Sequence, residues 1–371
     1  MVHRRSLLAA LLALAVLPAS AGAFTVGISD QHSQMFSSPL FAPLNIRYAR
    51  LVVPWNVAIK NTYATQVTEQ WLYGAALDHV EPHIAFSSPD YSKYYKDHGP
   101  TPHQYVLAFQ AFRRRWPAVK VFTPWNEENF YYQPTATRPE LAARYYETVV
   151  KLCRGCRVVA ADLLDQANLP TWVQRFKAAL GSRSPRLWGL HNYQDVNRRR
   201  SLRNSWTLRY AKLVKGEIWV TEGGGIVGLK SPANGRTVYP YSPTRAAASL
   251  RYFFQLLHEP AVRKRYDRGY VYCFFGAWNA HEQTNRWDSG LLGLDGKPRP
   301  AYAVLQSLVR REKGGNVSTP GKTPKPGKGP KPGKGPKPKP VKGPKPDTGA
   351  KPGNGPSTKP GETPPPVKHQ S

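Results

Sequence analysis

The feature that most restricts the fold of this chain is a regular alternation of short apolar runs with longer segments. Eight runs are rich in β-branched and aromatic side chains, a composition typical of strands that are buried on both faces. They span residues 24–29, 48–55, 80–87, 120–127, 157–165, 187–193, 217–224 and 269–277. The segments between them, several with apolar residues at helical spacing, include 104–115, 139–152, 170–179, 206–213, 242–257 and 300–311.

Strands that alternate with helices predict a parallel sheet, and eight such repeats predict closure into a (β/α)8 TIM barrel in the α/β class. The candidate domain, residues 24–312, has a length that suits one barrel of this kind. An open, doubly wound sheet is the alternative. We favour the barrel because no Gly-rich loop follows the first run, as it would in a nucleotide-binding sheet of that type.

The first residues have the order of a secretory signal peptide. Arg4 and Arg5 precede the apolar run 7–18, and the small residues Ala21-Gly22-Ala23 follow it. We therefore expect residues 1–23 to be removed on export. The apolar run is shorter than the about 20 residues that a membrane span needs, so the sequence predicts no transmembrane anchor.

Residues 313–371 have a different composition, with repeated Lys-Pro, Gly-Lys and Gly-Pro units. Almost none of these residues could enter a core, so we expect a disordered tail. Residues 314–371 hold 12 Lys against Asp347 and Glu362, and the whole chain has a net charge of +30. After this +10 and the two leader arginines are subtracted, the barrel keeps a net charge of about +18. Such a charge favours the binding of polyanions.

Two interpretations of the basic tail remain open. It either binds an anionic cell-wall polymer or acts as a solubilising spacer. The expected location is extracellular, with or without association to a cell wall. Nucleic acid is not an expected partner, because the chain has an export signal and no helix-turn-helix, zinc or RNA-binding motif.

Two of the three cysteines lie close together, in Cys153-Arg-Gly-Cys156. In an exported protein this spacing favours a short local disulfide, and two ordinary thiols are the alternative. No second pair of soft ligands accompanies them, so we expect no metal. Cys273 lies inside an apolar run and is expected in the core.

Polar and aromatic residues gather at the ends of several expected strands. These ends are Ser29-Asp30, Trp55-Asn56, Asn126-Glu127, His191-Asn192-Tyr193, Thr221-Glu222 and Trp278-Asn279. In a TIM barrel the strand ends meet on the carboxyl-terminal face, where active sites of this fold lie. The pattern therefore predicts a site at that face without yet indicating a reaction.

Two carboxyl groups are expected in that site. Glu127 ends the fourth strand and Glu222 the seventh, positions that face each other across a barrel mouth. Glycoside hydrolysis uses such a pair, about 5–5.5 Å apart in enzymes that retain the anomeric configuration. Glu128 is the rival of Glu127, and only one of two neighbouring strand residues can face the mouth. Structural ion pairing of Glu127 and Glu222 is the alternative.

Two segments around these residues resemble a known superfamily. Val121-Phe-Thr-Pro-Trp-Asn126-Glu127 resembles the Asn-Glu signature on the fourth strand of the retaining (β/α)8 glycoside hydrolases of clan A, such as families 5 and 39. Ile218-Trp-Val-Thr-Glu222 is similar to their seventh-strand segment. The resemblance implies that Glu127 is the acid/base, that Asn126 hydrogen-bonds the sugar 2-hydroxyl and that Glu222 is the nucleophile.

Looser matches imply four more site residues. Arg50 resembles the second-strand arginine that supports the nucleophile, and His191 and Tyr193 resemble a sixth-strand pair whose tyrosine orients it. Trp278 falls where an eighth-strand tryptophan forms the floor of the sugar site. A purely structural role is the alternative for each. Further candidates for the walls of the site are Trp55, Asn56, Tyr131, Tyr132 and Trp287.

The combined prediction is a secreted hydrolase that cleaves β-O-glycosidic bonds of an oligo- or polysaccharide with retention. It would act through a glycosyl–Glu222 intermediate, without metal or cofactor. Transfer of the sugar to an acceptor would use the same residues. Two non-enzymatic alternatives are a polysaccharide-binding barrel anchored to anionic wall polymers by its tail, and a cationic protein whose barrel only carries the tail.

Overall fold

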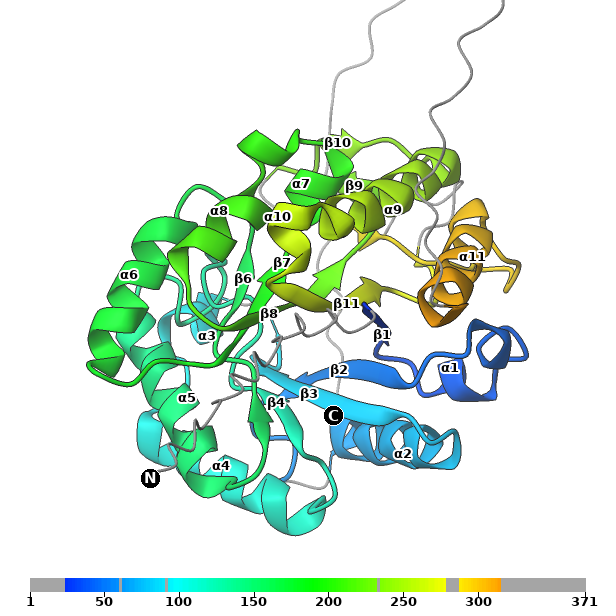
Figure 1. Ribbon diagram of the computed structural model, residues 1–371. Coiled ribbons are helices and arrows are strands. Elements are labelled where there is room, and N and C mark those ends of the chain that lie inside the picture. Colours follow the sequence, from blue (N-terminus) through cyan, green and yellow to red (C-terminus); the bar gives the residue numbers. More distant parts are fainter. Residues whose placement is uncertain (1–23, 60–61, 91–92, 232–233, 278–286, 315–371) are drawn as a thin grey trace, which may run out of the picture. The chain divides into compact units, whose positions relative to one another are not determined.

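A parallel sheet curls around the centre of the described part of the chain, with helices around it (Figure 1). The computed structural model describes residues 24–59, 62–90, 93–231, 234–277 and 287–314. The expected leader 1–23 and all but the first two residues of the expected tail lie outside these ranges. Within them, no helix combines the length and apolar character that a membrane span requires.

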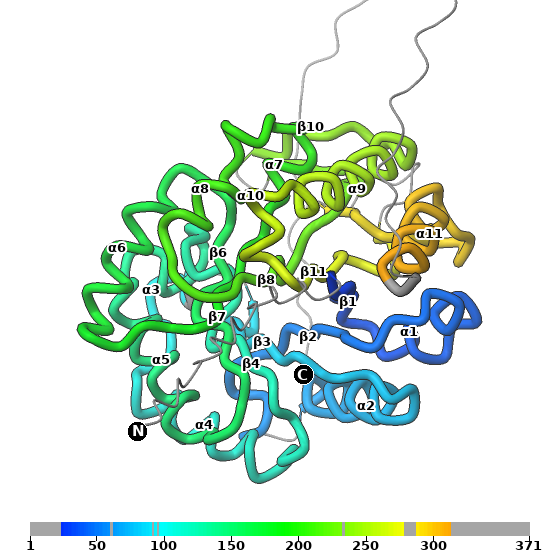
Figure 2. The backbone as a smooth tube through the Cα atoms, viewed as in Figure 1, coloured from blue at the N-terminus to red at the C-terminus, as the bar shows by residue number. Residues whose placement is uncertain are grey.

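The sheet has nine strands, each parallel to its neighbours. They are β1 (Thr25–Ser29), β2 (Tyr48–Pro54), β3 (Glu81–Ser87), β4 (Val121–Thr123), β5 (Arg157–Val158), β6 (Asp162–Leu164), β7 (Leu187–His191), β8 (Glu217–Gly223) and β11 (Tyr266–Tyr272). Their order is β5-β4-β3-β2-β1-β11-β8-β7-β6. The first strand, blue in Figure 2, therefore lies beside β11, and Thr25 pairs with Arg268.

The two edges of the sheet meet in one stretch of chain, which closes the barrel. β5 and β6 are the two ends of the expected strand 157–165; β5 pairs with β4, and β6 pairs with β7. Between them, the N–H of Val159 donates to the carbonyl of Phe122 (2.8 Å) and that of Ala160 donates to Leu187 (2.9 Å). The predicted (β/α)8 barrel is therefore confirmed, with β5 and β6 as one staggered strand.

Helices cover the outside of the sheet (Figure 1). The longer ones in the described ranges are α2 (Tyr63–Leu77), α4 (Pro102–Arg115), α5 (Pro139–Leu152), α6 (Leu169–Leu180), α8 (Trp206–Leu213), α9 (Pro243–His258) and α11 (Pro300–Gly314). The short ones are α1 (Gln34–Ser37), η1 (Ala42–Leu44), α3 (Lys93–Asp97), α7 (Tyr193–Asn197), η2 (Leu202–Asn204) and α10 (Pro260–Arg263). The helical spacing predicted all the longer helices except α2.

Helix α2 escaped prediction because its buried stripe is short of aliphatic side chains. Its buried residues are Thr65, Thr68, Trp71 and Ala75. A capping box starts the helix, in which Thr62 and Thr65 bond each other's backbone N–H groups. Trp71 then fixes the helix to the end of β1, because its Nε1 donates to the carbonyl of Asp30 at 2.9 Å.

The barrel interior contains both apolar and charged side chains. A small apolar cluster, separate from the main core, consists of Val121, Val159, Leu187, Trp219 and Tyr270. Elsewhere in the barrel, Arg50 is fully buried and lies 2.5 Å from Asp162. Charges are costly to bury unless they are paired and hydrogen-bonded. This polar part of the interior is therefore a candidate functional region.

A second, antiparallel sheet was not predicted. It consists of β9 (Gly228–Lys230), β10 (Thr237–Tyr239) and β12 (Trp287–Asp288), in the order β10-β9-β12. Two of its strands come from the segment between β8 and α9, and the third precedes α11. Such short, partly exposed strands lack the apolar runs that marked the barrel strands.

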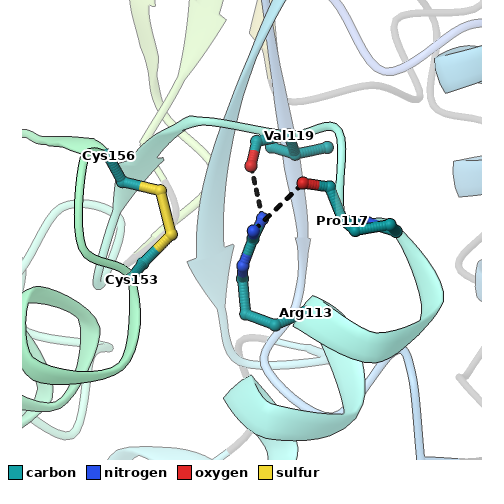
Figure 3. The surroundings of a disulfide bond; sticks show 5 residues. All are labelled: Arg113, Pro117, Val119, Cys153 and Cys156. Carbon is teal, nitrogen blue, oxygen red and sulfur yellow. Dashed lines mark hydrogen bonds between the residues drawn. A yellow bond between two sulfur atoms is a disulfide. The ribbon is translucent and has the colours of Figure 1, made fainter.

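Cys153 and Cys156 form a disulfide between the end of α5 and the start of β5 (Figure 3). The Arg113 guanidinium, drawn nearby, donates to the carbonyls of Val119 and Pro117 and so holds the turn that leads into β4. Cys273 is a buried free thiol, as its apolar surroundings in the sequence suggested.

Asp30 ties the first barrel strand to the last. It is fully buried, and its Oδ2 accepts the N–H groups of Phe274 (2.8 Å) and Phe275 (2.9 Å), just after β11. We expect Asp30→Ala to lower the free energy of unfolding by about 2–4 kcal/mol, because two buried N–H groups lose a charged acceptor. Denaturant titration measures this loss. The exposed Asp97→Ala in α3 is the control, and equal stability of both variants would contradict the role of Asp30.

Candidate active site

A cleft of about 660 Å³ opens where the carboxyl ends of the barrel strands meet. The residues that line it include Asn126, Glu127, Tyr193, Glu222, Tyr272 and Trp287. They come from the ends of β4, β7, β8 and β11 and from the small antiparallel sheet. The fold therefore brings four of the predicted site residues into one cleft.

Glu127 reaches the cleft from a loop, because β4 is shorter than predicted and ends four residues earlier. Its φ is 52°, in the left-handed region that non-glycine residues seldom adopt. Both neighbours are fixed: the N–H of Asn126 donates to Phe86 (2.7 Å), and that of Glu128 donates to Asp162 (3.1 Å). A strained conformation held from both sides is typical of a functional position.

Glu128 points away from the cleft. Its side chain is fully buried, and burial together with the charge of Asp162 raises the pKa of this carboxyl well above its usual range. Among the residues that the structure describes, neither of its carboxyl oxygens has a hydrogen-bond partner. Only Glu127 of the pair faces the cleft, and the cause is the turn at Glu127 rather than the pleat of a strand.

Glu222 lies near the end of β8 with a side chain that is 8% exposed. Its Oε1 accepts a hydrogen bond from Arg50 Nη1 at 2.5 Å, and its Oε2 accepts one from the Tyr193 hydroxyl at 3.2 Å. A cation on one oxygen and a neutral donor on the other stabilise the ionised carboxylate. The surroundings of Glu222 thus favour a negative charge at the edge of the cleft.

Arg50 connects four strand ends from inside the barrel. Besides Glu222, its guanidinium donates through Nη2 to Asp162 Oδ2 (2.5 Å) and to Asn126 Oδ1 (2.7 Å). Burial alone would lower the pKa of Arg50, but the charges of Asp162 and Glu222 outweigh it and raise the pKa above its ordinary value. The cation is therefore permanent, and it fixes the positions of both carboxylates and of the Asn126 amide.

Sequence reasoning missed Asp162. It begins β6, is fully buried, and accepts the Thr221 hydroxyl on Oδ1 at 2.6 Å while Arg50 occupies Oδ2. Burial opposes its ionisation, yet Arg50 holds the pKa of Asp162 far below its ordinary value. The signal in the sequence was an aspartate inside an otherwise apolar run, which requires a buried partner.

His191 lies between the carboxylates and is fully buried. Its Nδ1 is 3.3 Å from Glu127 Oε1 and 3.7 Å from Glu222 Oε2, and its Nε2 is 3.8 Å from Asp162 Oδ2. Burial by itself would lower the pKa of His191, but the nearby carboxylates of Glu222, Asp162 and Glu127 raise it to about 9. His191 is therefore a second cation near neutral pH.

The carboxylates of Glu127 and Glu222 lie close together. One ligand atom each from Glu127, His191 and Glu222 falls within 4.8 Å of the others. That spacing alone would suit a metal ion. The ligand set is less suited to one, because both oxygens of Glu222 already accept hydrogen bonds, Oε1 from Arg50 and Oε2 from Tyr193. The arrangement suits a reaction in which one carboxyl group attacks and the other transfers a proton.

The remaining predicted residues divide into three groups. Trp278 lies outside the described residues. Trp287 and Tyr132 line the cleft, and the Trp287 ring packs edge-on against Tyr193 with centroids 4.8 Å apart. Trp55, Asn56 and Tyr131 are not among the residues that line the cleft.

Comparison with known proteins finds similarity in structure only. No family model matches the chain, and no curated protein matches it. A family 39 glycoside hydrolase from Bacteroides cellulosilyticus superposes with a TM-score of 0.51 at 15% identity, covering 78% of this chain and 64% of that one. The chain thus spans about two thirds of that enzyme's length.

Two other solved structures match over most of their own length. A thermostable mutant of a xylanase from Cellvibrio japonicus has a TM-score of 0.54 at 13% identity, covering 78% of this chain and 99% of that one. GH5_18 from Streptomyces cattleya has a TM-score of 0.51 at 17% identity, covering 81% and 82%. The chain has the fold of these (β/α)8 glycoside hydrolases. At such low identity the likeness establishes only the fold. The reaction must be inferred from the residues of the site.

The raised pKa of His191 predicts a pH-dependent stability. A group whose pKa is higher in the folded state stabilises the fold fully below its unfolded pKa, about 6.5, and loses that effect as the pH rises through about 9. The stability advantage of the wild type over His191→Gln should therefore shrink by about 3 kcal/mol between pH 6 and pH 10. Denaturant titration across this range measures it. The exposed His103→Gln in α4 is the control, and parallel pH profiles for both variants would rule out a charged His191.

The Arg50–Asp162 pair predicts a graded loss of stability. Asp162→Asn removes the charge opposite a buried guanidinium and should cost about 3–5 kcal/mol. Thr221→Val removes only a hydroxyl donor from the same carboxylate and should cost about 1 kcal/mol. Thermal or chemical unfolding compares the two. Equal losses would mean that the charge of Asp162 contributes nothing.

Proposed function

We propose that this protein is a retaining β-glycosidase, with Glu222 as the nucleophile and Glu127 as the acid/base. The observation that carries the proposal is the pair itself: two carboxylates, with oxygens within 4.8 Å, share one cleft at the carboxyl face of a (β/α)8 barrel. A separation near 5 Å leaves no room for a water between sugar and carboxylate, which favours retention over inversion. The glycoside hydrolase fold supports the same reading.

The surroundings of Glu222 suit its proposed role as nucleophile. Glu222, held by Arg50 and Tyr193, attacks the anomeric carbon while the bond to the leaving oxygen breaks and Glu127 gives its proton to that oxygen. In the second step Glu127 takes a proton from water, the water oxygen attacks the anomeric carbon, and Glu222 leaves as a carboxylate. Two inversions at the same carbon restore the original configuration.

The surrounding residues position these groups. Asn126 accepts from Arg50 through Oδ1, which leaves its Nδ2 to donate to the sugar 2-hydroxyl. His191 donates through Nδ1 to Oε1 of Glu127, so Oε2 is left to exchange the proton. Trp287 and Tyr132 offer aromatic faces against which the apolar side of a sugar ring can pack.

We also propose that the protein is exported and works outside the cell. The basic start, apolar run and small-residue exit of residues 1–23 support export. The Lys-rich tail, residues 313–371, would add attraction to anionic polymers of a cell wall. Deletion of residues 315–371 should then leave turnover of a soluble substrate unchanged and weaken retention on isolated cell walls.

Substitution of the two glutamates tests the mechanism. On an aryl β-glycoside that the wild type hydrolyses, Glu127→Ala should lower kcat about 10²–10⁴-fold, because proton transfer is lost. Glu222→Ala should be inactive, and azide should restore turnover as an α-glycosyl azide, since only one inversion then occurs. The exposed Glu69→Ala, in α2, is the matched control and should equal the wild type.

Product configuration gives an independent check. Proton NMR of the first wild-type product should show the β-anomer. A first product in the α configuration would exclude retention. Wild-type rates in both Glu127→Ala and Glu222→Ala would exclude the mechanism, and sugar binding unchanged in those variants would then favour a non-catalytic polysaccharide-binding barrel.

A further inference from the structure

The wall of the cleft beyond the catalytic pair is basic. In the described part of the chain, the cations that line the cleft are Arg198, just after α7, and Lys230, at the end of β9. They follow two separate elements that both lead to Tyr193, the hydrogen-bond donor to the proposed nucleophile. α7 begins with Tyr193, whose hydroxyl bonds Glu222, and β9 pairs through Leu229 with Trp287, whose ring packs on Tyr193.

The carboxylates of the cleft lining do not pair with Arg198. Glu222 is already paired with Arg50, and Glu127 lies beside the positive His191. The third acidic residue of the lining, Asp165, is buried, and burial together with the nearby Asp195 raises its pKa well above the usual range. Arg198 is therefore a cation of the cleft lining that these carboxylates leave uncompensated.

In the described part of the chain, no side-chain hydrogen bond or ion pair accounts for the position of Arg198. It follows α7 in a run of three arginines and is exposed. The third of them, Arg200, lies 3.9 Å from Asp195 and bonds Gln194, so it holds the local fold. Among the described residues Arg198 forms no ion pair, and it is the member of the run that lines the cleft.

We propose that the substrate is an acidic β-glycan, with a carboxylate-bearing sugar bound beside the cleavage site and read by Arg198. The planar guanidinium fits a carboxylate through two parallel hydrogen bonds, and Lys230 adds a second positive charge to the cleft lining. This inference rests on the proposed glycosidase function. It concerns only which glycans the cleft prefers.

Two matched pairs of oligosaccharides test the proposal. β-1,4-Glucuronan oligosaccharides differ from cello-oligosaccharides only in the oxidation state of C6, and β-1,4-mannuronan oligosaccharides differ from β-1,4-manno-oligosaccharides in the same way. We expect the wild type to cleave the acidic member of at least one pair with a kcat/KM at least tenfold above that of its neutral partner. Because the attraction is partly electrostatic, this preference should fall as salt is raised.

The Arg198→Gln variant tests the contribution of Arg198 to this preference. It should lower kcat/KM on the acidic substrate about ten- to hundredfold, the size of a lost charge-assisted hydrogen bond, and change the neutral partner less than twofold. Arg199→Gln is the matched control, because it removes the same charge from the adjacent exposed position, which does not line the cleft. Equal effects of the two substitutions would overturn the role of Arg198.

Binding separates failure of this inference from failure of the proposed mechanism. In Glu222→Gln, calorimetric titration should show tighter binding of the acidic oligosaccharide than of its neutral partner, whether or not turnover occurs. Equal or weaker binding of the acidic members, or no binding of either, would overturn the acidic-substrate proposal. Hydrolysis of neutral aryl glycosides with the expected loss in Glu222→Ala would leave the glycosidase mechanism standing.

Discussion

The buried guanidinium of Arg50 is the interaction on which the site depends. It binds Asp162, Asn126 and Glu222 at 2.5–2.7 Å from the inside of the barrel, where a carboxylate without a partner could not stay charged. The strands β2, β6 and β8 must hold their register for these contacts to form. The stability of the barrel and the geometry of the site thus depend on the same hydrogen bonds.

The carboxylates differ because their neighbours differ. The two oxygens of Glu222 accept hydrogen bonds from the Arg50 guanidinium and the Tyr193 hydroxyl. Glu127 has a left-handed backbone conformation, and the imidazolium of His191 lies beside its Oε1. Two glutamates of the same site therefore have different proposed roles. The loops and the small sheet add Trp287, Arg198 and Lys230 to the lining of the cleft around this centre.

Local patterns in the sequence were enough for the barrel and for the position of the pair. The strands are nearly fully buried, so their apolar runs stand out, and the staggered β5–β6 strand was recognisable as one run. Helix α2 was missed because its buried stripe contains threonines, and β4 was predicted too long because the apolar run continues into the loop that bears Glu127. The short strands β9, β10 and β12 left no periodic signal at all.

By itself, the sequence determined the (β/α)8 barrel and the placement of Glu127 and Glu222 at its carboxyl-terminal face, because hydrophobic periodicity and the order of the runs can be read from local segments. Only the tertiary structure decided that Asp162 shares Arg50 with Glu222, that His191 becomes a cation, and that Arg198 lines the cleft. Such contacts join residues from strands and loops far apart in the chain. They depend on register, burial and barrel closure, which no single segment encodes.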